Sequence, residues 1–115
     1  MLYAMSLHIP TSVPEKGFYH HYKHDESQGL THHVYEVIGV AYHTEPDCRP
    51  EDYNLVIYRP IYESAVYKAG KFLDARPLTM FMEDVTKDGK TFPRFRKITD
   101  PMLVSELESI RDSMY

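Results

Sequence analysis

The sequence contains no tryptophan, one cysteine and only five glycines among its 115 residues. Cys48 has no second cysteine with which to form an intramolecular disulfide, so we expect a reducing compartment, the cytoplasm. No run of about 18 apolar residues is present that could span a membrane, and we expect no membrane partner. Residues 1–14 have no basic residue ahead of an apolar core, so we expect no signal peptide.

The sequence patterns of several enzyme classes are also missing. The five glycines are not clustered, which argues against a glycine-rich phosphate loop. There is no G-x-S-x-G elbow, and Cys48 lies in a polar stretch without an adjacent base, so nucleophilic catalysis is not indicated. The spacing of the carboxylates favours no particular acid–base reaction; those considered are Glu36, Glu45, Glu83 and Asp84.

The formal net charge is −4 at pH 7, with the seven histidines counted as neutral. A general nucleic-acid binder draws its affinity from a basic face, although a local patch can be basic on an acidic protein. Protonation of the histidines near their usual pKa of about 6.5 would carry the net charge through zero. We therefore expect any nucleic-acid contact to be small and local, for example single-strand stacking on a face with Phe18 and Tyr22.

The composition is that of a folded domain. Hydrophobic residues make up 43% and charged residues 26% of a chain whose length is typical of one domain. A chain of this size hides about two-thirds of its unfolded surface, so one core can form without a metal or a disulfide. We predict an N-terminal arm over residues 1–16, a β domain over 17–98 and a C-terminal amphipathic helix over 99–115.

Short segments rich in aromatic and β-branched residues predict a mainly β fold. The first covers residues 18–24, where period two places His21 and Lys23 on the face opposite Tyr22. Further strands are expected over residues 33–42, 54–59 and 72–73, and Gly39 predicts a bulge or a close backbone approach in the first of these. Residues 76–81 are predicted to form a tight turn or a single helical turn.

Two local motifs stand near the C-terminus. The pair Asp88-Gly89 supplies the positive φ values of a tight hairpin, with strands predicted over residues 81–85 and 91–98. Asp100 is a suitable N-cap, and Leu103, Leu107, Ile110 and Met114 then recur at helical spacing. Together these elements predict a small barrel or a curled antiparallel sheet with a C-terminal α-helix.

Seven histidines are many for a chain of this length. His20 and His24 would share a strand face about 13 Å apart by strand rise, too far to bind one ion together. In a helix the same spacing would suit zinc, but there is no paired cysteine and no H-E-x-x-H pattern. Ordinary hydrogen-bonded histidines are the favoured interpretation, and we predict no metal site and no cofactor.

Basic and tyrosyl side chains occur on several predicted strands and can meet on one face of a sheet. Arginine forks and tyrosine hydroxyls suit phosphate, nucleotide or carboxylate groups. In the alternative interpretation the tyrosines form the rim of the core, and Arg59 and Arg94 pair with carboxylates such as Glu36 or Glu83. The candidate ligand-binding residues are Tyr19, His21, Lys23, His43, Tyr58, Arg59, Tyr62, Arg76 and Arg94.

Five segments follow one another in a specific order: GFYHHYK (17–23), YEVIGVAYHTE (35–45), LVIYRPIY (55–62), RPLTMF (76–81) and DGKTFPRF (88–95). In this order they resemble a small bacterial family, the domain of unknown function 1653, over residues 17–98. The resemblance implies a compact SH3-like β-barrel and no established activity. It places the family's polar and aromatic signature on Tyr19, His21, Tyr22, Lys23, His43, Glu45, Tyr58, Arg59, Tyr62, Arg76, Asp88, Arg94 and Phe95.

The chain departs from the family pattern at three places. The family usually has glycine after the Tyr-Lys pair, whereas His24 and a longer connection follow that pair here. Tyr42 stands where an arginine is common, and Asp74-Ala75 occupies the neighbourhood of a usual tryptophan.

The hypothesis that these observations favour is a non-enzymatic binding module for an anionic ligand: a nucleotide, a nucleic acid or an acidic peptide. Its face would be formed by His21, Lys23, Tyr58, Arg59, Arg76 and Arg94. One alternative is a small enzyme with His21 or His43 as acid or base and Arg59 stabilising an anionic transition state. Another is a structural or assembly protein, homo-oligomers included, in which the C-terminal helix contacts a partner.

Overall fold

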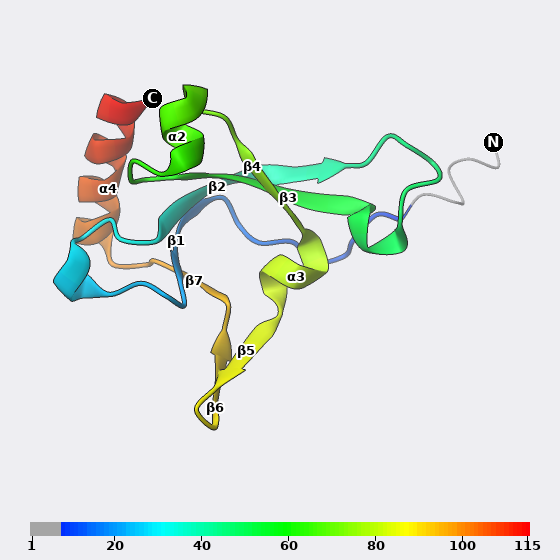
Figure 1. The fold of residues 1–115 in the computed structure, drawn as a ribbon, viewed down its shortest axis with the longest axis horizontal. Helices are drawn as coiled ribbons and strands as arrows, with labels where there is room; N and C mark the ends of the chain where they lie inside the picture. The colour runs from blue at the N-terminus through cyan, green and yellow to red at the C-terminus, as the bar shows by residue number, and fades with distance from the viewer. Residues whose placement is uncertain (1–7) are drawn as a thin grey trace.

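The computed structural model describes residues 8–115 as a curled antiparallel sheet with a helix at the C-terminal end (Figure 1). Five strands form the sheet in the order β4-β3-β2-β1-β7, so β4 and β7 are its edges. These strands are β1 (Gly17–His21), β2 (Val34–Tyr42), β3 (Asn54–Pro60), β4 (Asp74–Pro77) and β7 (Phe95–Lys97). Of the two predicted architectures the curled sheet is confirmed, and no closed barrel forms within the described residues.

Strands β5 (Asp84–Lys87) and β6 (Lys90–Pro93) form a separate hairpin that projects from the body of the molecule (Figure 1). Its turn is the predicted Asp88-Gly89 pair, whose φ angles are 53° and 75°. Positive φ at both central residues matches the right-handed twist of the flanking strands. The single strand predicted over residues 91–98 is wrong. The strand is interrupted at Arg94, and the two parts, β6 and β7, belong to different sheets.

The strand predicted over residues 18–24 is shorter than expected. β1 ends at His21, and a turn follows in which the His24 N–H donates to the His21 carbonyl oxygen at 2.8 Å. The turn stacks the ring of His24 on that of His20, with centroids 4.0 Å apart. The separation of about 13 Å expected from strand rise is therefore wrong, because it assumed that the extended backbone continues to His24.

Other local predictions fare unevenly. The pairing of β2 with β3 shifts between Val37 and Gly39, which confirms the predicted bulge. The strand predicted at residues 72–73 is wrong, since Phe72 and Leu73 are exposed and β4 begins at Asp74. Within residues 8–115 the helices are η1 (Glu26–Gln28), η2 (Pro50–Asp52), α2 (Ala65–Gly70), α3 (Leu78–Met82) and α4 (Pro101–Met114). The helical turn predicted over residues 76–81 corresponds to α3, but it begins later than predicted because Arg76 and Pro77 belong to β4.

Buried side chains line both faces of the sheet. On one face α4 covers a cluster made of Phe18, Val34, Ile61, Ile98 and Leu107. The side chain of Asp100 accepts a hydrogen bond from the Met102 N–H at 3.1 Å and caps this helix as predicted. The predicted helical spacing is confirmed as well, because Leu107 is fully buried and the neighbouring apolar residues pack against the same cluster. The opposite face carries Tyr19, Val37, Val56, Tyr58, Leu78, Phe81 and Phe95.

A buried carboxylate fastens α4 to the sheet. Glu36 on β2 accepts a hydrogen bond from Arg59 Nε at 2.9 Å and one from Arg111 Nη1 at 2.8 Å. The Arg59 guanidinium lies 4.1 Å from the ring centroid of Tyr115, whose hydroxyl donates to the Pro60 carbonyl oxygen at 2.6 Å. Removal of one partner from such a shielded pair is costly, because the remaining charge is left buried without its counter-charge.

The described part of the N-terminal arm runs beside the β2–β3 hairpin. The His8 ring stacks on Tyr53 with centroids 4.3 Å apart, and the His8 carbonyl oxygen accepts from Asn54. Residues 1–7 of the predicted arm lie outside the described residues, and its boundary at residue 16 stays a prediction. None of the helices in residues 8–115 combines the length and the apolar character that crossing a membrane requires.

Candidate functional site

The sheet face opposite α4 carries a floor of aromatic rings, here called the aromatic face: Tyr19, His21, Tyr35, Tyr58 and Phe95. Strand alternation decides this arrangement, because period two sends Phe18 toward α4 and its neighbour Tyr19 to the other side. Antiparallel pairing then sets His21 opposite Phe95 and Tyr19 opposite Tyr35. The rings pack edge to face, with centroids 5.0 Å apart for His21 and Phe95 and 5.4 Å for Tyr35 and Tyr58.

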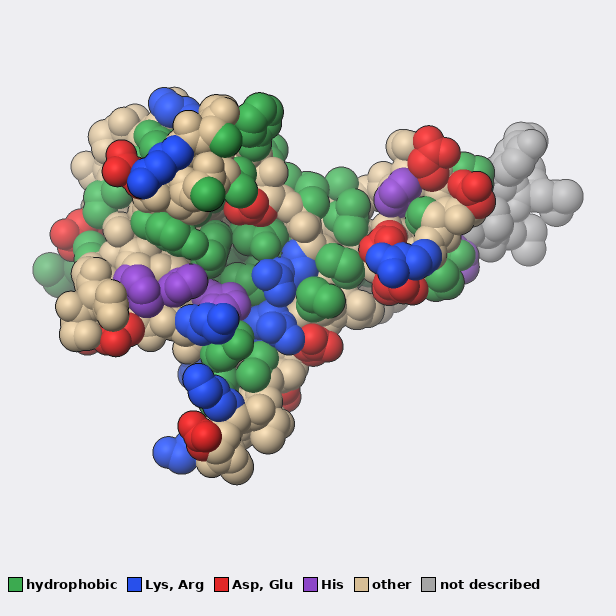
Figure 2. Space-filling model, viewed as in Figure 1, with side chains coloured by type: hydrophobic (Ala, Val, Ile, Leu, Met, Phe, Trp, Pro, Cys, Tyr) green, Lys and Arg blue, Asp and Glu red, His purple; other side chains and the backbone are tan. Residues whose placement is uncertain are grey.

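This floor is closely packed and largely buried. Phe95 also stacks on Phe81 of α3 with ring centroids 4.0 Å apart, so a helix supports it from the side. Tyr19, Tyr58 and Phe95 are each less than a tenth exposed. Figure 2 shows this side of the molecule hollowed at its centre, with histidine and basic side chains around an apolar floor. Electrostatic interactions at such a site are less screened than those on an open surface.

Three cations come to this face from separate elements. Arg76 on β4 donates from Nε to the Tyr58 hydroxyl at 3.2 Å, and its guanidinium carbon lies 5.6 Å from the Phe95 ring centroid. Arg94, at the break between β6 and β7, bonds Glu83 through Nη2 at 2.7 Å. Lys23 follows β1 in the turn. Among the salt bridges within residues 8–115, Arg76 and Lys23 take part in none.

The positive charges near this face affect the pKa of His21. The residue is 9% exposed, and its Nδ1 accepts a hydrogen bond from the Lys23 N–H at 3.1 Å. Burial, followed by the nearby His33, Arg76, Lys23 and Arg94, lowers the pKa of His21 to about 4. The ring is therefore neutral at pH 7, and because Nδ1 already accepts a hydrogen bond, its Nε2–H can donate one without bringing a further charge.

Hydroxyl groups line the side of the face near β2 and β3. The Tyr35 and Tyr62 hydroxyl oxygens are 2.5 Å apart, and His33 Nδ1 lies 3.5 Å from the Tyr35 hydroxyl. Burial and the Tyr62 hydrogen bond raise the pKa of Tyr35, so its hydroxyl keeps its proton. Burial also raises the pKa of Asp74, against the opposing effect of Arg76. His33 has a φ of 50°, an uncommon left-handed conformation for a residue other than glycine.

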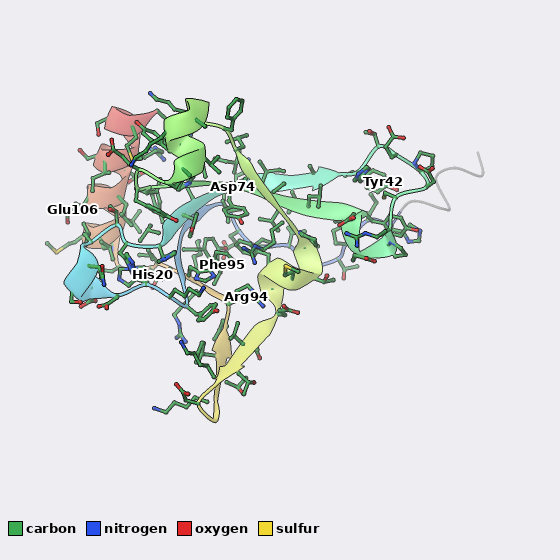
Figure 3. The ribbon with its side chains drawn as sticks, viewed as in Figure 1. His20, Tyr42, Asp74, Arg94, Phe95 and Glu106 are labelled. Atoms are coloured by element: carbon green, nitrogen blue, oxygen red, sulfur yellow. The ribbon has the colours of Figure 1, made fainter. Side chains whose placement is uncertain are left out.

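The structure brings most of the sequence-predicted site residues to one side of the sheet. Arg94 and Phe95 lie together near the centre of Figure 3, and Asp74 lies on β4 beyond them. His43 follows β2 at the far end of the β2–β3 hairpin, beside the labelled Tyr42 and bonded to Tyr53. Those brought to the aromatic face or its rim are Tyr19, His21, Lys23, Tyr58, Tyr62, Arg76 and Arg94.

Arg59 lies elsewhere. It bonds Glu36 and faces Tyr115 under α4, on the opposite side of the sheet from Tyr58. Arg59 pairs with Glu36 and Arg94 pairs with Glu83, as the alternative interpretation of the sequence predicted. For Arg94 the two interpretations are compatible, because its carboxylate partner is half exposed and the guanidinium still lies at the rim of the aromatic face.

Sequence reasoning missed three contributors to this face, namely His33, Tyr35 and Asp74. Tyr35 could have been found from the sequence. It lies two residues before Val37 on a strand that is apolar on both sides, so the two side chains share one face of the sheet. His33 had none, because its place depends on the positive φ at the end of a long turn. Among residues 8–115 there is no group of three or more metal-binding side chains placed to hold an ion.

The comparisons with known proteins identify a family and no activity. A family model described as "Protein of unknown function (DUF1653)" matches residues 17–97, which spans β1 to β7 and contains every residue of the aromatic face. No curated protein and no solved structure matches the chain.

Proposed function

The chain belongs to the DUF1653 family of proteins of unknown function, and from that premise we propose that its aromatic face binds a nucleotide. The ligand would place its phosphate against Arg76 and the neighbouring cations and its base on the aromatic floor. This would make the protein a binding module rather than an enzyme.

The guanidinium of Arg76 is the observation that carries this proposal. Only its Nε donates a hydrogen bond among residues 8–115, to the Tyr58 hydroxyl, and both Nη nitrogens remain for a ligand. The side chain is half-buried against Phe95, where a planar fork is held in one orientation. Arginine in such a setting suits the bidentate recognition of a phosphate or carboxylate.

The floor favours a nucleotide over a plain inorganic anion. The half-buried rings of His33, Tyr35 and Tyr62 offer surface on which a base can pack, and base–aromatic stacking is worth about 1–3 kcal/mol. Neutral His21 can donate a hydrogen bond from Nε2–H, and the hydroxyls of Tyr35 and Tyr62 can both donate and accept. A cavity with apolar walls and a few convergent polar groups is the common form of a small-molecule site.

Calorimetric titration with AMP, ADP, adenosine and pyrophosphate tests the proposal. We expect AMP and ADP to bind more tightly than either adenosine or pyrophosphate, because each of these lacks one half of the contacts. Arg76→Gln should weaken AMP binding about tenfold to a hundredfold, the usual worth of a hydrogen bond to a charged group. Arg49→Gln is the matched control, since Arg49 is exposed on the far loop beside Glu51 and Asp52.

Two results would overturn this function. One is the absence of heat and of thermal stabilisation with AMP and ADP at millimolar concentration. The other is an unchanged AMP affinity in Arg76→Gln when circular dichroism shows that the variant is folded.

The alternative functions have less support. An enzyme that combines His21 with Arg59 would need groups from opposite sides of the sheet, and His43 lies at the far end of the β2–β3 hairpin. For assembly through the C-terminal helix, α4 already packs most of its apolar residues against the domain's own sheet and leaves Met102 exposed. Neither alternative has a specific observation in its favour.

A further inference from the structure

Aromatic side chains continue from the aromatic face toward the projecting hairpin. The Tyr22 ring lies 4.5 Å from that of His21, and the Phe92 ring on β6 lies 5.8 Å from Tyr22, both measured between centroids. A pocket of about 290 Å³ opens beside them. Its lining residues are His20, His21, Tyr22, His24, Phe92, Pro93 and Arg96. Because His21 belongs to both places, the pocket adjoins the aromatic face.

Basic side chains accompany these rings. Lys23 Nζ lies 5.9 Å from the Tyr22 ring centroid, and Arg94 stands where the hairpin leaves the sheet. Figure 2 shows lysine and arginine side chains extending from the hollow of the face along the projecting hairpin. At the end of the hairpin Lys87 and Lys90 are exposed and lie directly opposite each other in the β5–β6 pairing.

The two opposed lysines are unfavourable for the hairpin by itself. Like charges directly across an antiparallel pair destabilise it, and neither lysine forms a salt bridge within residues 8–115. An anion that lies along the hairpin would relieve this repulsion. Strand β6 spans about 10 Å from Lys90 to Pro93 by strand rise, and Arg94 lies beyond its end, so a single mononucleotide on the aromatic face would not reach both ends.

We propose that the nucleotide site is one end of a groove for single-stranded nucleic acid that continues along Tyr22 and Phe92 to Lys87 and Lys90. The inference rests on the proposed function and extends it from a mononucleotide to a short polymer. One base would pack on the aromatic face, the next rings would offer stacking surfaces, and the hairpin lysines would contact phosphates. Stacking platforms beside a basic track are the usual means of binding single strands.

Single strands fit these observations better than duplex. Bases inside a duplex are stacked on each other and cannot reach Tyr22, Phe92 or the small pocket beside them. Duplex binding also draws on a broad basic surface, whereas this chain has a net charge of −4 and its basic residues follow a narrow path.

Fluorescence anisotropy with labelled eight-nucleotide oligoadenylates, ribose and deoxyribose, tests the groove. We expect the octamer to bind at least tenfold more tightly than AMP does by calorimetry. The double variant Lys87→Gln, Lys90→Gln should weaken octamer binding about tenfold and leave AMP affinity unchanged. It should also reduce the magnitude of the slope of log K against the logarithm of the salt concentration by about 1.4, because two phosphate contacts are lost and each contributes about 0.7.

The controls separate the groove from the mononucleotide site. Lys68→Gln, Lys71→Gln removes the same charge from exposed positions at α2 and should leave octamer affinity unchanged. Arg76→Gln should weaken both the octamer and AMP. If AMP binds through Arg76 but the octamer binds no more tightly than AMP, the groove proposal is wrong and the proposed nucleotide site is still supported.

Three further outcomes would overturn the groove. The first is an unchanged salt slope in the hairpin variant, and the second is tighter binding of an eight-base-pair duplex than of the single strand. The third is tighter binding of an acidic octapeptide than of either oligonucleotide. The substituted lysines are exposed and the Lys87–Lys90 pair is repulsive, so a thermal melt equal to or slightly above that of the wild type is expected and verifies that the variants are folded.

Discussion

Replacing His21 by asparagine is expected to make the fold less sensitive to acid. The pKa of His21 is about 4 in the folded protein because the ring is buried beside His33, Arg76 and other cations. In the unfolded chain the ordinary value is about 6.5. The unfolded state therefore binds more protons below pH 6.5, and stability is lost as the pH falls from about 6.5 toward 4.

The size of this loss follows from the two pKa values. Between pH 7.5 and pH 5, protonation of the unfolded chain at this one residue lowers the free energy of unfolding by about 2 kcal/mol. Asparagine does not titrate, and its side-chain oxygen can replace Nδ1 as acceptor for the Lys23 N–H. The variant should thus lose about 2 kcal/mol less than the wild type over this pH interval.

Urea unfolding at the two pH values, followed by circular dichroism, measures the difference. His43→Asn is the matched control, because His43 Nδ1 also accepts a backbone N–H two residues ahead, from Glu45, but its contact is exposed. We expect this control to follow the wild type. Equal pH dependence of His21→Asn and wild type would refute the reasoning, since it would mean that His21 titrates alike in both states.

Three other outcomes are expected. Glu36→Ala should lower the free energy of unfolding by about 3–5 kcal/mol, because Arg59 and Arg111 lose the carboxylate between them. Urea unfolding measures this loss, with Arg49→Ala as a control that should cost at most about 1 kcal/mol. Leu107→Ala should cost about 2–5 kcal/mol by leaving a cavity under α4, and a midpoint shift in urea without a change in slope would confirm it. Octamer affinity measured by anisotropy should rise only below the ordinary histidine pKa of about 6.5, because burial lowers the pKa of His20, which lines the pocket beside Tyr22 and Phe92; a profile that stays flat in acid would contradict a phosphate track beside His20.

Local chemistry was enough to predict several elements. The cap at Asp100 and the helical spacing around Leu107 depend on neighbouring residues only, and the structure confirms both. The same holds for the Asp88-Gly89 turn and the bulge at Gly39. The predictions that failed are two strand ends, the strand at residues 72–73 and the placement of Arg59 and His43 on the candidate face. A residue pattern does not fix where the extended backbone stops or which elements pack together.

The aromatic and histidine-rich segment after Gly17 illustrates the limit. Its composition correctly favours a strand, but the strand ends at His21 and a turn redirects the residues that follow. That turn stacks His24 on His20 and places Lys23 beside the buried His21. Period two cannot foresee either contact, because alternation holds only while the backbone stays extended.

The sequence by itself determined the mainly β class, the C-terminal helix, the hairpin turn and the basic and tyrosyl residue types of the candidate site. Only the tertiary structure decided which of them meet. Arg59 and Tyr58 are neighbours in sequence, yet alternation sends Arg59 under α4 to Glu36 and Tyr58 to the aromatic face with Arg76. Strand pairing between distant segments is what assembles that face, and such long-range contacts leave no periodic pattern in the sequence.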